Sequence, residues 1–241
     1  MIIKDIGFLA AFWGGFYSFF SIWQLCLMQI TPFFLAFAVG LYMLEGGSEL
    51  RTPNSRITGL LLACAGYILG FSIVFALMGT SGWGAAAYII YNIEDFRKAA
   101  AAYMTVIALL MLFYNRYIIS IPHSTFRILC LPIGILLGAS FAVAYSPCIP
   151  PVMSSIMNFA SKPGNAHRGF HLLAVYGFGV TLAFAISGIL LSTAVGYFIV
   201  RKSARNIIVY LSSGTLFIMA FLIITDLMIR YKSFLVGLVL D

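Results

Sequence analysis

Long hydrophobic runs, separated by short polar stretches, fill most of this chain. A membrane-spanning α-helix needs about 20 consecutive apolar residues. Four runs fit one such helix each, at residues 57–80, 99–120, 169–198 and 206–229. The charged residues gather in the separators between the runs. The pattern therefore predicts helices that cross a membrane and are joined by polar loops.

Two further runs, at residues 6–44 and 128–161, are too long for one straight span. A continuous helix over residues 6–44 would be roughly 58 Å long, against a hydrocarbon thickness of about 30 Å. Two full spans with a turn would need more residues and a polar turn that neither run contains. We therefore predict that each run forms one broken element with irregular backbone near the middle of the membrane.

Each long run contains proline at a position that suits a break. In QLCLMQITPFF, Thr31 suits an N-cap and Pro32 suits the first position of a following helix. In SPCIPPVM, proline occurs at Pro147, Pro150 and Pro151, where it removes backbone hydrogen bonds from a helix. Breaks at membrane depth persist where the freed groups face protein or a water-filled cavity. The breaks are therefore the predicted functional sites.

The chain also repeats itself. The segment GFSIVFA at residues 70–76 aligns with GVTLAFA at residues 179–185, and a broken run precedes each segment. Each broken run has one cysteine beside its break, Cys26 in the first and Cys148 in the fourth. The matched cysteines favour a true repeat over chance similarity between apolar sequences.

The repeat predicts how the halves are arranged. Residues 1–120 and 121–241 would each contribute three spans to a single transmembrane domain. Because three is odd, the second half would insert upside down relative to the first. The predicted fold is an all-α polytopic membrane protein with six transmembrane segments, built as two inverted three-helix repeats with broken first and fourth helices.

Composition agrees with a lipid-embedded chain, since 62% of the residues are hydrophobic and 9% are charged. The 14 Lys and Arg residues give a net charge of +7 but are scattered, which argues against a nucleic-acid partner. The positive-inside rule gives no orientation, because these residues divide equally between the two predicted faces. The first 20 residues lack the pattern of a secretory signal, so we expect no cleavage there.

The segment AYSPCIPPVMSSI and the runs that follow it resemble the CcdA family and the related membrane domain of DsbD, over essentially the whole chain. In that family a proline directly precedes each reactive cysteine and another follows three residues later. Pro147 and Pro151 match this motif around Cys148.

The first cysteine motif departs from the family pattern. Leu25 precedes Cys26, Gln29 stands three residues after it, and Pro32 follows at six residues. This departure puts the usual partners and activity in doubt. Gln29 is interpreted as a hydrogen-bonding group between helices or to the backbone near the break.

The resemblance implies a transmembrane carrier of reducing equivalents. Cys26 and Cys148 would form a redox-active disulfide that accepts electrons from a cytoplasmic thioredoxin. The carrier would pass them to an extracytoplasmic thioredoxin-like protein, as in cytochrome c-type biogenesis. The implied location is the cell membrane of a prokaryote, with both termini outside, and no cofactor or metal is expected.

Thiol-disulfide exchange needs a thiolate, which the N-terminus of a helix stabilises. If Pro150 opens the second half-helix, Cys148 lies just ahead of such an N-terminus. Cys26 lies five residues before Thr31, so we expect it at the end of the preceding half-helix, where a thiolate is disfavoured. The thiolate is therefore expected at Cys148 more than at Cys26.

The remaining polar residues and cysteines have structural interpretations. Cysteine is common as a small buried residue, and Asp226 can pair with Arg230 one helical turn later. Structural roles are expected for Cys64, Cys130, Gln24 and Asp226, and solvated positions in or beside loops for His123, His167 and His171. An alternative function stays open, because the same fold can serve different functions. The protein would then be a membrane transporter, or an accessory subunit of a membrane complex without redox activity.

Overall fold

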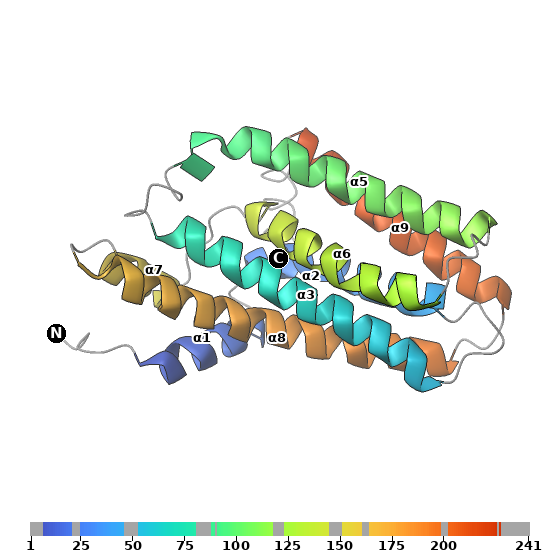
Figure 1. Cartoon of the computed structure of the whole chain (residues 1–241), viewed down its shortest axis with the longest axis horizontal. Helices are drawn as coiled ribbons and strands as arrows, with labels where there is room; N and C mark the ends of the chain where they lie inside the picture. The colour runs from blue at the N-terminus through green and yellow to red at the C-terminus, as the bar shows by residue number, and fades with distance from the viewer. Residues whose placement is uncertain are drawn as a thin grey trace, which may run out of the picture.

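The computed structural model describes residues 7–20, 25–45, 53–80, 88–89, 91–117, 123–144, 151–160, 164–198, 202–225 and 227. These residues form a bundle of α-helices that run roughly along one long axis (Figure 1). The helices are α1 (Phe8–Phe20), α2 (Leu25–Glu45), α3 (Pro53–Gly79), α5 (Ile93–Tyr117), α6 (His123–Ala144), α7 (Pro151–Ala160), α8 (Ala166–Phe198) and α9 (Lys202–Ile224).

The predicted single spans are confirmed as helices. Among the described residues, four helices are long and apolar enough to cross a membrane. Their apolar windows are Ile57–Gly79, Ile93–Phe113, Ala166–Tyr197 and Asn206–Ile224. Large apolar side chains such as Leu190 and Leu211 are 64% and 65% exposed on these helices. Such a surface suits lipid, and the chain is a multi-pass membrane protein.

Two described helices lie along each long run. Residues 6–44 include α1 and nearly all of α2, and residues 128–161 include most of α6 and all of α7. The intervals 21–24 and 145–150 lie outside the described residues, so the breaks expected there stay predictions.

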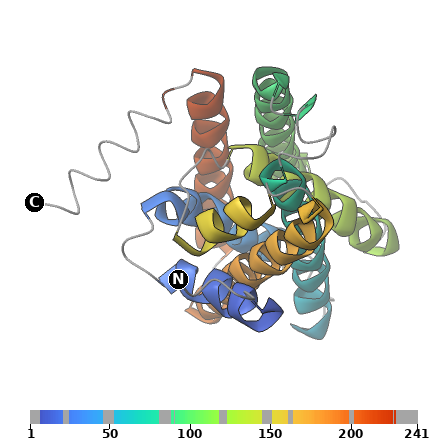
Figure 2. The same ribbon diagram turned by 90° about the vertical axis from the view of Figure 1, so that its left-hand side faces the viewer.

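The bundle is held together by a small set of helix pairs. α3 packs against α6 and α8, while α1 packs on α8 and α5 packs on α9. Both views place α5 beside α9 at one edge of the bundle and α1 at the opposite edge (Figures 1 and 2). α2 contacts both α8 and α9, so it links the two edges through the interior.

Glycines bring the backbones of α1 and α8 into contact. A Cβ on Gly15 would overlap the backbone of Tyr176, and one on Gly179 would overlap the carbonyl of Phe12. Small residues allow this close approach between helices in a membrane. The α1–α8 contact thus depends on two glycines, one from each helix.

The contact of α3 with α6 repeats this geometry. A Cβ on Gly138 would overlap the carbonyl of Tyr67, and one on Gly70 would overlap the carbonyl of Ile135. Tyr67 and Gly70 of α3 correspond in the sequence repeat to Tyr176 and Gly179 of α8. The same glycine-mediated crossing therefore occurs twice, once with α1 and once with α6.

Candidate functional site

The structure places the backbone of Cys26 in the first turn of α2, as the second residue of that helix. Its side chain lies outside the described residues. The expectation that Cys26 ends the preceding half-helix is therefore wrong, because α1 ends at Phe20. A residue in a first turn lies among unpaired N–H groups and the positive end of the helix dipole, which favour a thiolate.

The expected helix start at Thr31 and Pro32 is also wrong, because α2 continues through Pro32. The proline costs one backbone hydrogen bond. The residues that follow compensate, because Phe34 and Phe37 are 1% and 2% exposed and belong to the hydrophobic core. Their packing holds the helix where local cap preference alone would have ended it.

The start of α7 lies close to the helix start that the sequence predicted. The described helix begins at Pro151, one residue after the start expected at Pro150. Proline suits a first helical position, where its missing N–H needs no partner. Pro147, Cys148 and Pro150 lie outside the described residues, so the pairing of Cys148 with Cys26 stays a prediction.

The interior beside α2 is filled by aromatic rings around Tyr67. The ring of Tyr67 lies 4.5 Å from that of Phe34 on α2, 5.8 Å from Phe141 on α6 and 6.5 Å from Phe184 on α8. Tyr67 is fully buried near the middle of the apolar window Ile57–Gly79. Pieces of both broken elements, α2 and α6, therefore meet one side chain of α3 at mid-span.

The hydroxyl group of Tyr67 is buried without a hydrogen-bond partner among the described residues. The equivalent tyrosine at the other crossing, Tyr176, has one: its hydroxyl oxygen lies 2.9 Å from that of Ser18 on α1. At the Tyr67 crossing, the position equivalent to Ser18 is held by Phe141, whose ring cannot accept in the same way. The two crossings therefore share a backbone geometry and differ in polarity.

The other two cysteines, for which structural roles were expected, lie in the hydrophobic core. Cys64 and Cys130 are 5% and 1% exposed. Both lie inside helices, Cys64 on α3 and Cys130 on α6.

His167 and His171, expected in or beside a loop, lie in the first two turns of α8. Their rings meet edge to face with centroids 4.5 Å apart. His123 begins α6, and its side chain lies outside the described residues. Within the described ranges, no group of three or more His, Cys, Asp or Glu residues is placed to hold a metal ion. Gln24 and Asp226 lie outside the described residues, and so does the side chain of Gln29.

The sequence reasoning missed Tyr67, Tyr176 and Ser18. A signal was present, because the repeat that aligns Gly70 with Gly179 also aligns the two tyrosines. Their environments differ through α1 and α6, which have no detectable sequence similarity around Ser18 and Phe141.

These features define a class: a polytopic helical membrane protein with a buried aromatic centre around Tyr67. The chain is similar to the cytochrome c-type biogenesis protein CcdA of Halalkalibacterium halodurans, with 27% identity over 190 residues, or 76% of this chain and 75% of that relative. This similarity agrees with the resemblance to the CcdA family drawn from the Cys148 motif. No family model matches the chain, and no solved structure matches it.

Proposed function

We propose that this protein is a transmembrane thiol-disulfide carrier of a prokaryotic plasma membrane and serves cytochrome c biogenesis. It would take reducing equivalents from a cytoplasmic thioredoxin and pass them to an extracytoplasmic thioredoxin-like protein. The similarity to a CcdA protein supports the pathway, and two cysteines beside two breaks support the chemistry.

The position of Cys26 is the observation that carries the proposal. Its backbone lies in the first turn of α2, the helix that follows α1 along the chain. Such a position provides the field that stabilises a thiolate, and a break at membrane depth would provide room for water. Cys148 would lie close to the start of the other second half-helix, three residues before α7.

We further propose that the halves 1–120 and 121–241 are inverted repeats. The reciprocal crossings support this arrangement, because α1 meets α8 as α6 meets α3, with equivalent glycines at both contacts. In such a fold the discontinuous elements face each other near the membrane midplane. The two cysteines would then converge, although they are far apart in sequence.

The exchange would run in two balanced steps. A thiolate of the reduced cytoplasmic partner attacks the Cys26–Cys148 disulfide, forms a mixed disulfide and releases the other cysteine as a thiolate. The partner's second thiolate then breaks the mixed disulfide, so that the partner is oxidised and the carrier holds two thiols. The reverse sequence on the other face reduces the extracytoplasmic protein.

Trapping of mixed disulfides tests this function. Single variants Cys26→Ser and Cys148→Ser are expected to accumulate a mixed disulfide with a thioredoxin-like partner, because the resolving thiol is gone. The matched control Cys64→Ser changes a buried cysteine and is expected to trap nothing. A transporter or accessory subunit would give no adduct with either variant, and that outcome would refute the carrier.

A further inference from the structure

An apolar groove of about 530 Å³ lies between α1, α3 and α8. Its volume is within the range of about 300–1,000 Å³ that small-molecule sites have. The groove opens to the outside of the bundle, since Leu69 and Ile73 on its wall are 51% and 50% exposed. It is lined by Phe8, Ile68, Leu69, Ser72, Ile73, His171, Ala174, Val175 and Phe178.

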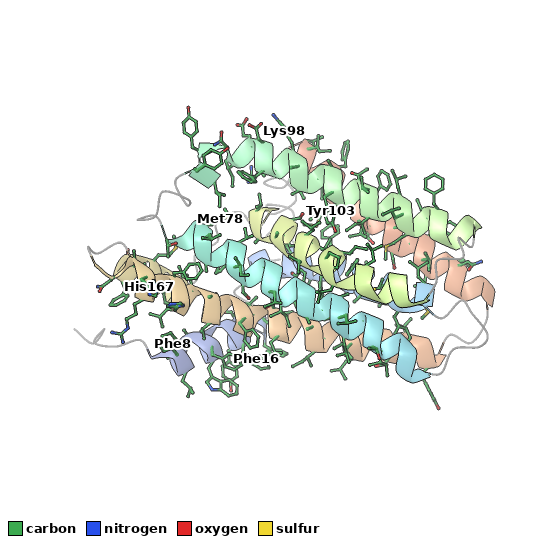
Figure 3. All side chains as sticks on the ribbon, viewed as in Figure 1. Phe8, Phe16, Met78, Lys98, Tyr103 and His167 are labelled. Carbon is green, nitrogen blue, oxygen red and sulfur yellow. The ribbon has the colours of Figure 1, made fainter. Side chains whose placement is uncertain are left out.

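The groove runs from the membrane surface toward the middle of one leaflet. The apolar window Ala166–Tyr197 of α8 has 32 residues, so it extends beyond the hydrocarbon core on both sides. Along that helix, His171 lies roughly 16 Å from the centre of the window and Phe178 roughly 5 Å from it, against a half-thickness of about 15 Å. Figure 3 shows Phe8 and His167 at the same end of the bundle. The groove therefore has one end at headgroup level and one end among acyl chains.

Its outer end is basic. The ring of His171 lies 4.5 Å from that of His167, and Arg168 lies between them in sequence on the same turns of α8. The first turn of α8 contains no acidic residue, and the N-terminus of the helix adds unpaired N–H groups and positive potential. An imidazole N–H can donate to a phosphate oxygen in either protonation state, and arginine is always charged.

We propose that this groove binds an anionic phospholipid. One acyl chain lies along Ile73, Val175 and Phe178, and the phosphate accepts hydrogen bonds from His167 and His171. The order of polarity in the groove, basic at the surface and apolar toward the midplane, matches the order in one phospholipid. The bound lipid fills the space between α1 and α3 and so holds α1 against the rest of the bundle. This site is separate from the cysteines and does not depend on their chemistry.

Quenching by brominated lipids tests the site in the full chain. The three tryptophans are first replaced by phenylalanine, and Phe178→Trp then places a reporter at the deep end of the groove. The matched control is Ile186→Trp, which lies on the same helix outside the groove and at similar depth. Phe178 and Ile186 are both 43% exposed, so bulk lipid reaches both positions alike.

The reporter at position 178 is expected to be quenched by brominated phosphatidylglycerol at a several-fold lower mole fraction than by brominated phosphatidylcholine. The reporter at position 186 is expected to show no preference. The double variant His167→Ala with His171→Ala is expected to abolish the preference at position 178. Equal quenching by both lipids at position 178, or a preference that survives the loss of both histidines, would overturn the proposal.

A second measurement uses the unmodified chain and needs no tryptophan replacement. The melting temperature of delipidated protein in a neutral detergent is expected to rise more with added phosphatidylglycerol than with phosphatidylcholine. The difference is expected to vanish in the double histidine variant. An equal rise with both lipids would contradict a site that selects an anionic headgroup.

Discussion

The hydroxyl oxygens of Tyr176 and Ser18 lie 2.9 Å apart and join α8 to α1 inside the bundle. Tyr67 stands at the equivalent place on α3, where Phe141 of α6 replaces the serine and the tyrosine hydroxyl has no partner among the described residues. Two crossings with the same glycine geometry therefore make a matched pair, one with a hydrogen bond and one without. Comparing the two crossings allows the contribution of this hydrogen bond to the free energy of unfolding to be measured within one protein.

Tyr176→Phe is expected to lower the free energy of unfolding by about 1 kcal/mol, because it removes an interhelical hydrogen bond and keeps the ring. Tyr67→Phe removes a buried hydroxyl without a partner, so stability is expected to stay unchanged or to rise. Unfolding of the purified protein in mixed micelles by SDS measures both values. A loss for Tyr67→Phe as large as for Tyr176→Phe would show that the Tyr67 hydroxyl is bonded in the folded state.

The close backbone contacts at the glycines predict that helical glycines differ strongly in how much an alanine substitution destabilises the protein. Gly70→Ala is expected to destabilise the protein by about 1–3 kcal/mol, because its Cβ would overlap the carbonyl of Ile135 and push α3 away from α6. Gly179→Ala is expected to do the same at the contact of α8 with Phe12 on α1.

Gly214→Ala is the control for these variants. Gly214 lies within α9, and a Cβ there would meet nothing within 4 Å. Alanine is the better helix former by about 1 kcal/mol, so this variant is expected to be neutral or stabilising. Equal losses for Gly70→Ala and Gly214→Ala would contradict the close backbone contact.

The single spans could be predicted from sequence, because a helix that crosses a membrane needs only enough length and enough apolar residues. The start of α2 could not, because Thr31 and Pro32 have strong local preferences for a helix start. Packing of Phe34 and Phe37 in the core overrides these preferences.

The repeat was visible in sequence, but its physical meaning was not. Gly70 and Gly179 align in the sequence, but only the structure shows that each faces the backbone of another helix. The environment of the candidate site could not be predicted from sequence either. In the sequence, Tyr67 is one more aromatic residue in an apolar run. Its hydroxyl lacks a partner among the described residues, and the neighbouring Phe141, which is distant in sequence, cannot provide one.

Reactivity toward a maleimide is expected to separate the four cysteines. Cys64 and Cys130 are buried in the core, which shields their thiols from the reagent. A variant with Cys26→Ser and Cys148→Ser is therefore expected to stay unlabelled in native membranes and to react fully after denaturation in SDS. The reduced wild-type chain is expected to react in native membranes. Fast native labelling of the double variant would show that the core opens around α3 and α6.

Membrane topology gives the last prediction, because it depends on whether the broken element α6–α7 crosses the whole bilayer. Between residues 50 and 165 the chain passes through α3, α5 and the pair α6–α7. Three crossings place these two positions on opposite faces, while two crossings would place them on the same face. Alkaline phosphatase fused after residue 165 is expected to be active, and the fusion after residue 50 inactive, as outward termini require. A reporter such as green fluorescent protein, which is fluorescent on the cytoplasmic side, is expected to give the opposite pattern. The same activity at both positions would mean that α6 and α7 do not form a span, and the inverted repeat would then be wrong.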